Sequence, residues 1–449
     1  AVERVDMTAR RGTANSDGTI GYLAAVSIGV GGMVGGGIFA VLGLAVGVGG
    51  GGTFLAFLVA GLVALVTTYS YARLSIAMPS DGGTVTFLDA AFGSGSIPGT
   101  LNVLLWLSYV ITTALYAYAF GSYGSTLLPD SAETLSLHVL ISAVILVITA
   151  LNVFSAKLIA AAEDYIVAAK IAILVLFVAF ALTQADLGAS APAEWESAGS
   201  LIAGGMLIFV AYEGFELIAN AAGDIRNPKR EIPRALYTSV LFTIVLYMLV
   251  AIVTVGLLSP SEIVSAADFA LAEAAQQVWG GIGFNLIVVA ALLSTASAIN
   301  ATLYGTSRLS VDIALDGELP TRLERKIAGK PLVGLFLTAA ASLAIANFVP
   351  LAAISSLASA GFLIIFAAVN VANVRLADRT ESHRYISVCG AIMCLGALVA
   401  LIAHIAADRP ADLILLGGLI ALTYLGEATY QHRRRRRPLA QESGDGSPG

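Results

Sequence analysis

Charged residues are scarce in this chain. They make up 12% of its 449 residues, about half of their usual share in soluble domains, and no polar interval is long enough to fold as a separate soluble domain. Apolar runs long enough to cross a bilayer as helices recur instead. The sequence therefore predicts an all-α membrane protein with about 12 transmembrane helices, at residues 22–47, 52–76, 98–126, 135–153, 156–184, 199–222, 235–258, 280–310, 331–349, 351–376, 386–407 and 411–430.

Cysteine and histidine are also few, with two and four copies. Cys389 and Cys394 are five residues apart, so they point to different faces of one helix. The histidines have no metal-ligand spacing. No nucleophile with a neighbouring base is visible in the apolar runs. We therefore expect no metal site, no cofactor and no enzyme activity.

Basic residues occur in every second connection between the apolar runs, and the other connections carry acids. Because arginine and lysine are retained on the cytoplasmic side, this pattern predicts a multi-pass protein of the cytoplasmic (plasma) membrane with both termini in the cytoplasm. We expect no cleavable signal peptide before the first run. The run Arg433–Arg437 is interpreted as facing anionic membrane lipid, and no nucleic acid partner is expected.

One ammonium group lies in the middle of an apolar run. Lys170 is at the centre of the stretch from Ser155 to Thr183, with roughly 20 Å of helix on either side at 1.5 Å per residue. An ionisable residue at that depth is costly and usually marks an ion or substrate path. The alternative is a structural lysine that snorkels or pairs with Glu163 or Asp164.

Two apolar runs contain residues that break helices. Three glycines in a row, Gly35–Gly37, interrupt the first run, and each glycine costs a helix up to about 1 kcal/mol. Close packing between helices is the other use of such glycines. In the sixth run, Glu213 and Glu216 flank Gly214. Breaks at corresponding places in two halves predict a transporter site between inverted repeats.

This pairing predicts how the chain is organised. Runs one to five and six to ten form the two repeats, and the last two runs are accessory. The predicted divisions are a cytoplasmic tail 1–19, a first inverted repeat 20–184, a second inverted repeat 199–376, accessory spans 386–430, and a basic then polar cytoplasmic tail 431–449.

The ends of broken helices predict what binds there. Free N–H groups near Gly36 and Gly37 begin a half-helix, and a helix N-terminus suits a carboxylate. Unpaired carbonyls around Met33 and from Val210 to Glu213 suit an ammonium. A ligand that carries both groups on one carbon is an α-amino acid.

Five segments together resemble the amino acid-polyamine-organocation (APC) permease family, in particular its proton-coupled amino acid transporters. The similarity covers residues 20 to 430, and the sixth run with its basic loop is its most specific part. The segments are GMVGGGIF (32–39), PSDGG (79–83), FVAYEGFE (209–216), RNPKREIP (226–233) and DGELP (316–320).

The resemblance implies a five-plus-five inverted-repeat fold with helices 1 and 6 unwound at mid-membrane, and transport by alternating access. It implies two sets of neighbours. The substrate set is Met33, Gly35, Gly36, Gly37, Phe209, Val210, Tyr212 and Glu213. The set around the coupling-ion site is Gly31, Val34, Ser294 and Ser297.

Proton coupling is also implied by the resemblance. Some proton-coupled members place a lysine at the sodium site, and Lys170 is similar to that residue. Glu216 is a second proton candidate, and capping of the unwound backbone is its alternative role. Many members have a small or apolar residue in place of Glu213 and a serine in place of Gly36, so the carried amino acid stays open.

These features predict a secondary active transporter that couples amino acid symport to protons. An obligate exchanger, of amino acids alone or of amino acids against polyamines, would share every motif. A non-transporting amino acid sensor would need a signalling domain, and none is visible. A channel would need a continuous polar stripe. The oligomeric state is open.

Overall fold

A computed structural model describes residues 18–80, 82–93, 95–129, 133–266, 268–315 and 331–435. Every named element in that part of the chain is a helix, and two isolated bridges are its β-type pairings. The predicted all-α class is confirmed. Most of the two predicted tails and the segment 316–320 lie outside the described residues.

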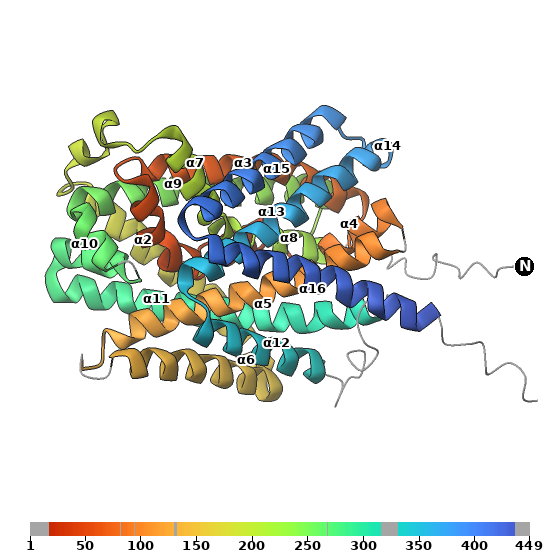
Figure 1. Ribbon diagram of the computed structural model, residues 1–449, viewed down its shortest axis with the longest axis horizontal. Coiled ribbons are helices and arrows are strands. Elements are labelled where there is room, and N and C mark those ends of the chain that lie inside the picture. Colours follow the sequence, from red (N-terminus) through yellow and green to blue (C-terminus); the bar gives the residue numbers. More distant parts are fainter. Residues whose placement is uncertain are drawn as a thin grey trace, which may run out of the picture.

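The helices follow the apolar runs of the sequence, because a backbone in an apolar setting must satisfy its own hydrogen bonds. Most run back and forth along the long axis of the bundle (Figure 1). Their bounds are α1 Tyr22–Met33, α2 Gly37–Gly49, α3 Thr53–Ala77, α5 Ser96–Ser125, α6 Glu133–Ala181, α7 Ala198–Leu207, α8 Leu217–Asn220, α9 Pro228–Leu257, α11 Ala270–Leu315, α12 Leu332–Phe348, α13 Leu351–Arg375, α15 Arg384–Asp408 and α16 Pro410–Arg435.

Short helices lie in the connections. Three are α-helical: α4 Gly83–Phe92, α10 Pro260–Ser265 and α14 Ala377–Thr380. Four are 3₁₀-helical: η3 Leu187–Ser190, η4 Pro192–Glu194, η5 Phe209–Tyr212 and η6 Ala222–Asp224. Figure 1 places α10 at one end of the bundle and α4 and α14 at the other.

Within the described residues, seven helices are long and apolar enough to cross a membrane, and the bent pair of α1 and α2 makes an eighth. Four shorter apolar helices accompany them: Tyr165–Ala181, Ala198–Leu207, Leu332–Phe348 and Pro410–Leu425. The chain is therefore a multi-pass membrane protein. Length and composition alone do not reach the predicted count of 12.

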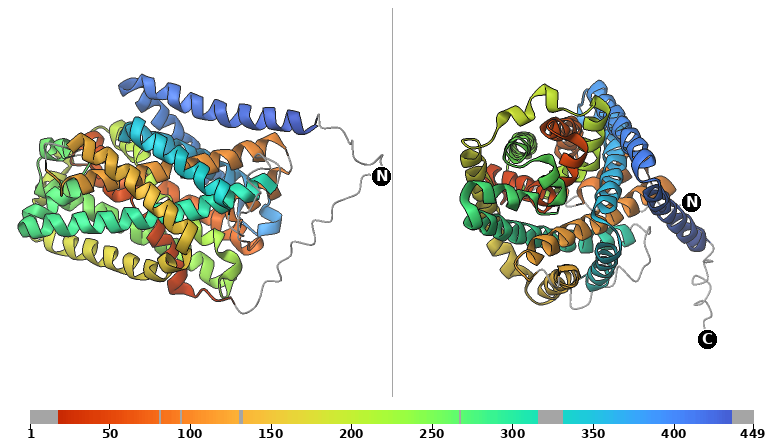
Figure 2. Two further views of the ribbon diagram at one scale, coloured as in Figure 1. Left: turned by 90° about the horizontal axis from the view of Figure 1, so that it is seen from below. Right: turned by 60° about the vertical axis from the view of Figure 1, so that its left-hand side comes forward.

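Helix α6 contains two of the predicted runs. Its 49 residues would measure about 74 Å as a straight rod, far more than the roughly 30 Å hydrocarbon core of a bilayer. Its apolar parts are Leu135–Phe154 and Tyr165–Ala181. Figure 2 shows the two parts as separate arms that run in different directions, so α6 is not one straight span; its first part is long and apolar enough to cross a membrane, and its second part is a shorter apolar helix.

Helices α5 and α13 are largely buried and form the centre of the bundle. A polar cluster fixes α15 to this centre. Ser70 Oγ of α3 lies 2.7 Å from Asn370 Oδ1 of α13 and 3.0 Å from Ser387 Oγ of α15. Because buried polar groups need partners, these contacts set the register of α15 against α3 and α13.

The segments that lead into α1 and out of α8 are bonded to each other. Ile20 N–H donates to the Asp224 carbonyl at 3.0 Å, and Arg226 N–H donates to the Ile20 carbonyl at 2.8 Å. The Arg226 Nε–H also donates to the Gly18 carbonyl at 2.7 Å. These bonds hold α1 and α8 together at the end of the bundle that carries the basic segment 226–234, of which residues 228–234 begin α9.

Candidate functional site

The first apolar run is divided into two helices. Helix α1 ends at Met33, α2 begins at Gly37, and their axes differ by 46°. Glycine is required here because neighbours approach closely. A Cβ on Gly37 would lie 2.8 Å from Ala211 Cα, and a Cβ on Gly36 would overlap the Tyr116 ring.

The sixth run is interrupted as well. The α-helix ends at Leu207, η5 follows, and the chain is extended at Glu213 (φ −62°, ψ 142°) before α8 begins. Gly214 has a φ of +118°, which favours glycine. A Cβ on Gly214 would lie 2.6 Å from the Gly32 carbonyl carbon. The two interrupted runs therefore touch through two glycines.

Side chains from three helices cover the carbonyls at the end of α1. Lys170 Nζ donates to the Gly31 carbonyl at 2.9 Å, and Tyr247 OH donates to the Met33 carbonyl at 2.6 Å. Ser294 Oγ donates to the Val34 carbonyl at 2.9 Å and also contacts the Gly35 carbonyl. These contacts satisfy groups that a helix end leaves unpaired.

Replacing Tyr247 with phenylalanine is expected to lower the free energy of unfolding by about 1–3 kcal/mol, because it removes the donor of a buried carbonyl. The hydroxyl also lies 3.2 Å from the Ala211 carbonyl, so it joins both breaks. Thermal melting of purified protein in detergent checks this. Tyr424→Phe, at an exposed position of α16, is the control; equal melting temperatures for the two variants would contradict the role.

Lys170 points into the protein. Its side chain is 1% exposed. Glu163, which lies earlier in α6, interacts with it electrostatically. Glu163 Oε1 in turn accepts a hydrogen bond from Ser297 Oγ at 3.2 Å. The Asp164 side chain lies outside the described residues. The structure thus brings Lys170 to the end of α1, within the group of residues predicted to surround a coupling ion.

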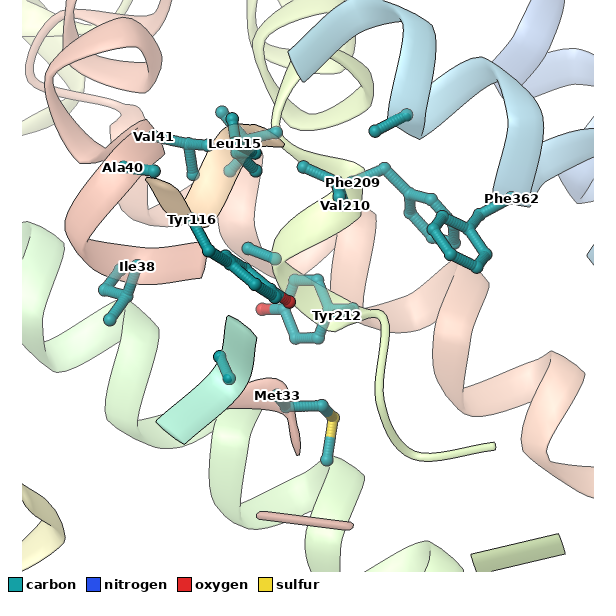
Figure 3. Close-up of a cluster of buried hydrophobic side chains, with 14 of the residues drawn as sticks. Met33, Ile38, Ala40, Val41, Leu115, Tyr116, Phe209, Val210, Tyr212 and Phe362 are labelled. Atoms are coloured by element: carbon teal, nitrogen blue, oxygen red, sulfur yellow. The ribbon is translucent and has the colours of Figure 1, made fainter. Parts of the chain in front are cut away.

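The start of α2 presents free donors. The amides of Gly36 and Gly37 make no hydrogen bond within the described residues. Tyr116 reaches this helix start from α5 (Figure 3), and its ring covers Gly36. The first N–H groups of a helix and its dipole favour an anion, so this point suits a carboxylate.

Two buried carboxyl groups lie at the break in the sixth run. Glu213 Oε2 accepts a hydrogen bond from Tyr116 OH at 2.8 Å. Glu216 Oε1 accepts one from Tyr109 OH at 3.0 Å, and its Oε2 accepts one from Gly214 N–H at 2.8 Å. Glu216 therefore caps the irregular backbone, which is the alternative that the sequence left open beside a proton-carrying role.

A cavity of about 130 Å³ lies between the two breaks and the second arm of α6. Five helices, α1, α5, α6, α8 and α11, and the segment after η5 border it. Its lining residues are Ser27, Ile28, Gly31, Gly32, Tyr116, Glu163, Val167, Glu213, Leu217, Ser297, Ala298, Ala301 and Thr302.

Of the predicted substrate set, Glu213 lines this cavity, whereas Met33 and Gly35–Gly37 are not among its lining residues. Three further residues of the set, Phe209, Val210 and Tyr212, are bonded or packed elsewhere. The Phe209 ring packs 5.8 Å from that of Phe366, away from Met33 (Figure 3). Tyr212 OH donates to the Phe57 carbonyl of α3 at 2.8 Å. Val210 N–H donates to Ser359 Oγ of α13 at 3.0 Å. In this conformation they anchor the broken run to its neighbours.

Sequence reasoning missed the tyrosines that serve the site. Tyr109 and Tyr116 hold the two carboxyl groups, and Tyr247 joins the two breaks. One signal was available: Tyr109, Tyr116 and Tyr123 are seven residues apart, which puts them on one face of a helix. Nothing in the sequence around Tyr247 marks it as different from other core tyrosines.

The comparison with known families fits this geometry. Residues 20–415 match the amino acid permease family. The chain belongs to that family. The permease is 35% identical over 379 residues to an uncharacterized protein of Methanocaldococcus jannaschii, an alignment that covers 84% of this chain and 87% of the relative.

Two further relatives of the permease have transport in their names. The inner membrane transport protein YbaT of Escherichia coli is 32% identical over 415 residues, covering 92% of this chain and 96% of the relative. The branched-chain amino acid permease BcaP of Bacillus subtilis is 24% identical over 375 residues, 78% of each chain. Family membership makes this protein an amino acid transporter of the membrane and not an enzyme.

Proposed function

We propose that the permease is a proton-coupled amino acid symporter that works by alternating access. The observation that carries this proposal is the Lys170 ammonium, buried and bonded to the Gly31 carbonyl at the end of α1. A positive charge on a side chain, which can gain or lose its proton, takes the place of a bound sodium ion at this point. Its gain or loss of a proton then alters the contact between α1 and α6.

The architecture that goes with this function has 12 spans in two inverted repeats of five, with the breaks of the first and sixth spans at mid-membrane. Consistent with it, α6 has two apolar parts, one for each of two spans, and α7, η5 and α8 together make one interrupted span. The two breaks then face each other across the repeat interface, where substrates of such folds bind.

The amino acid binds between the breaks. Its carboxylate accepts hydrogen bonds from the free amides of Gly36 and Gly37, at the positive end of the α2 dipole. Its ammonium lies toward Met33 and the residues after η5. Tyr116, which touches both Gly36 and Glu213, separates these two subsites and responds to occupation of either.

The coupling step is a change in one hydrogen bond. Protonated Lys170 makes a charge-assisted bond to the Gly31 carbonyl, and such bonds are roughly twice as strong as neutral ones. Loss of the proton weakens the link between α1 and the second arm of α6, and so favours movement of α1. Glu163 interacts with Lys170 and, together with its hydrogen-bond partner Ser297, lines the cavity, through which the proton can leave.

The cavity indicates which side is open. It borders Gly31, Gly32 and Leu217, on the side of the breaks where α1 begins and α8 leads to the basic segment 226–234. Basic loops remain in the cytoplasm of the plasma membrane. We therefore propose that this conformation is inward-facing and that both termini lie in the cytoplasm.

Uptake into proteoliposomes tests the function. We expect a labelled amino acid to accumulate when the lumen is more alkaline than the medium, and accumulation to stop when a protonophore collapses the gradient. Exchange of labelled for unlabelled amino acid without such accumulation would make the permease an obligate exchanger. Binding without any uptake or exchange would make it a sensor.

A further inference from the structure

We infer that the side-chain carboxylate of Glu213, rather than backbone carbonyls alone, receives the ammonium of the substrate. This inference rests on the proposed function and names the substrate class of the same site. The ligand is a small α-amino acid with a free ammonium, and the matching hydroxy acid is rejected.

Three of the backbone carbonyls at the two breaks already have donors. The Met33 carbonyl accepts from Tyr247, the Val34 carbonyl from Ser294, and the Val210 carbonyl from Glu213 N–H at 3.0 Å. A carbonyl can accept a second hydrogen bond. An ammonium nevertheless gains more from a carboxylate, because the bond is charge-assisted on both sides.

Of the two glutamates at the break, Glu213 is the one that faces the ligand. It borders the cavity, and its Oε2 accepts a hydrogen bond from the Tyr116 hydroxyl. Glu216 does not border the cavity, and both of its oxygens have donors, from Tyr109 and from Gly214 N–H. Glu216 serves the backbone, whereas Glu213 presents its carboxylate to the cavity.

The charges around Glu213 call for a cation. Its carboxyl group interacts with that of Glu216, and two neighbouring carboxylates repel unless a proton or another positive charge compensates them. The buried ammonium of the site, Lys170, is bonded to Gly31 on another wall and faces Glu163. A substrate ammonium beside Glu213 supplies the missing charge.

The remaining contacts define the rest of the ligand. Gly36 lies against the Tyr116 ring, whose hydroxyl is bonded to Glu213, and Gly37 follows it at the start of α2. This places the helix start near Glu213, as a ligand with a carboxylate on the carbon that carries the ammonium requires. The cavity of 130 Å³ has the volume of about four water molecules. In this conformation the site therefore favours short side chains, such as that of alanine.

Two ligand pairs that differ only at the ammonium test the inference. Alanine and lactate form one pair, and leucine and 2-hydroxyisocaproate form the other. Competitive binding is measured by equilibrium dialysis on the purified full chain, without any need for transport. Wild-type protein is expected to prefer the amino acid of at least one pair. Glu213→Gln should reduce this preference by about tenfold or more, the usual effect of a hydrogen bond between charged groups.

Glutamine can still accept the hydrogen bond from Tyr116, so the fold should survive this substitution. Glu196→Gln is the matched control, since it removes one negative charge at an exposed position just before α7; it should leave the preference within about twofold. Glu213→Asp, which keeps the charge, should retain more of the preference than Glu213→Gln. It is the variant to measure if Glu213→Gln does not fold.

Three results would overturn the inference. Hydroxy acids that bind wild-type protein as well as amino acids do would exclude an ammonium receptor. An unchanged preference in Glu213→Gln would exclude this carboxylate as the receptor of the ammonium. A proton shared by Glu213 and Glu216 would then be what compensates their charge. An equal loss in Glu196→Gln would show a general charge effect. Failure of the proposed function is separate, since it appears as wild-type protein that binds the amino acid yet lacks gradient-driven uptake.

Discussion

Lys170→Ala is expected to reduce amino acid uptake driven by a pH gradient by at least about tenfold, while counterflow of labelled amino acid persists. The substitution removes the buried ammonium and its bond to the Gly31 carbonyl. A hydrogen bond to a charged group contributes about 1.5–3 kcal/mol, which corresponds to a factor of about 10 to 100 in an equilibrium. Uptake at a series of external pH values, in proteoliposomes with a constant lumenal pH, measures the effect.

Lys170→Arg tests whether transport needs only the positive charge or also the gain and loss of its proton. Arginine keeps its proton in proteins, so this variant should also lose gradient-driven uptake although the positive charge remains. Val175→Ala, at an exposed position on the same arm of α6, is the control for changes in this helix and should behave as the wild type does. If Lys170→Ala retained the full pH dependence of uptake, the proton would have to travel by another residue.

The breaks and the span limits were accessible from the sequence because they are local properties. The second run was placed at 52–76 and α3 covers Thr53–Ala77; the tenth was placed at 351–376 and α13 covers Leu351–Arg375. Each limit depends on where apolar residues stop. The glycines of the first run likewise mark a break in the helix, since a helix interior seldom tolerates three together.

The site's donors could not be predicted in the same way, since they depend on pairing between distant parts of the chain. Tyr247 and Met33 are 214 residues apart, and Tyr116 and Glu213 are 97 apart. Sequence reasoning treated the α1 carbonyls as free because it had no means to place α9 and α11 against them. The same gap left Tyr212 assigned to the ligand, although its hydroxyl is bonded to Phe57 of α3.

Gly214→Ala is expected to reduce uptake to background and to lower the melting temperature. Residues with a side chain seldom adopt a φ of +118°, and holding one there costs about 1–3 kcal/mol. The added Cβ would also lie 2.6 Å from the Gly32 carbonyl carbon and 2.7 Å from Met33 N. These are backbone atoms that cannot rotate away, so the two broken runs would be forced apart.

Separation of the breaks would affect both halves of the site at once. Glu216 Oε2 accepts from Gly214 N–H, and Lys170 holds the turn of α1 that packs against Gly214. Gly417→Ala, in α16 with open space around the added Cβ, is the matched control and should keep the uptake and melting temperature of the wild type. Normal uptake by Gly214→Ala would mean that the contact between the two breaks is dispensable, and that transport does not require them to stay together.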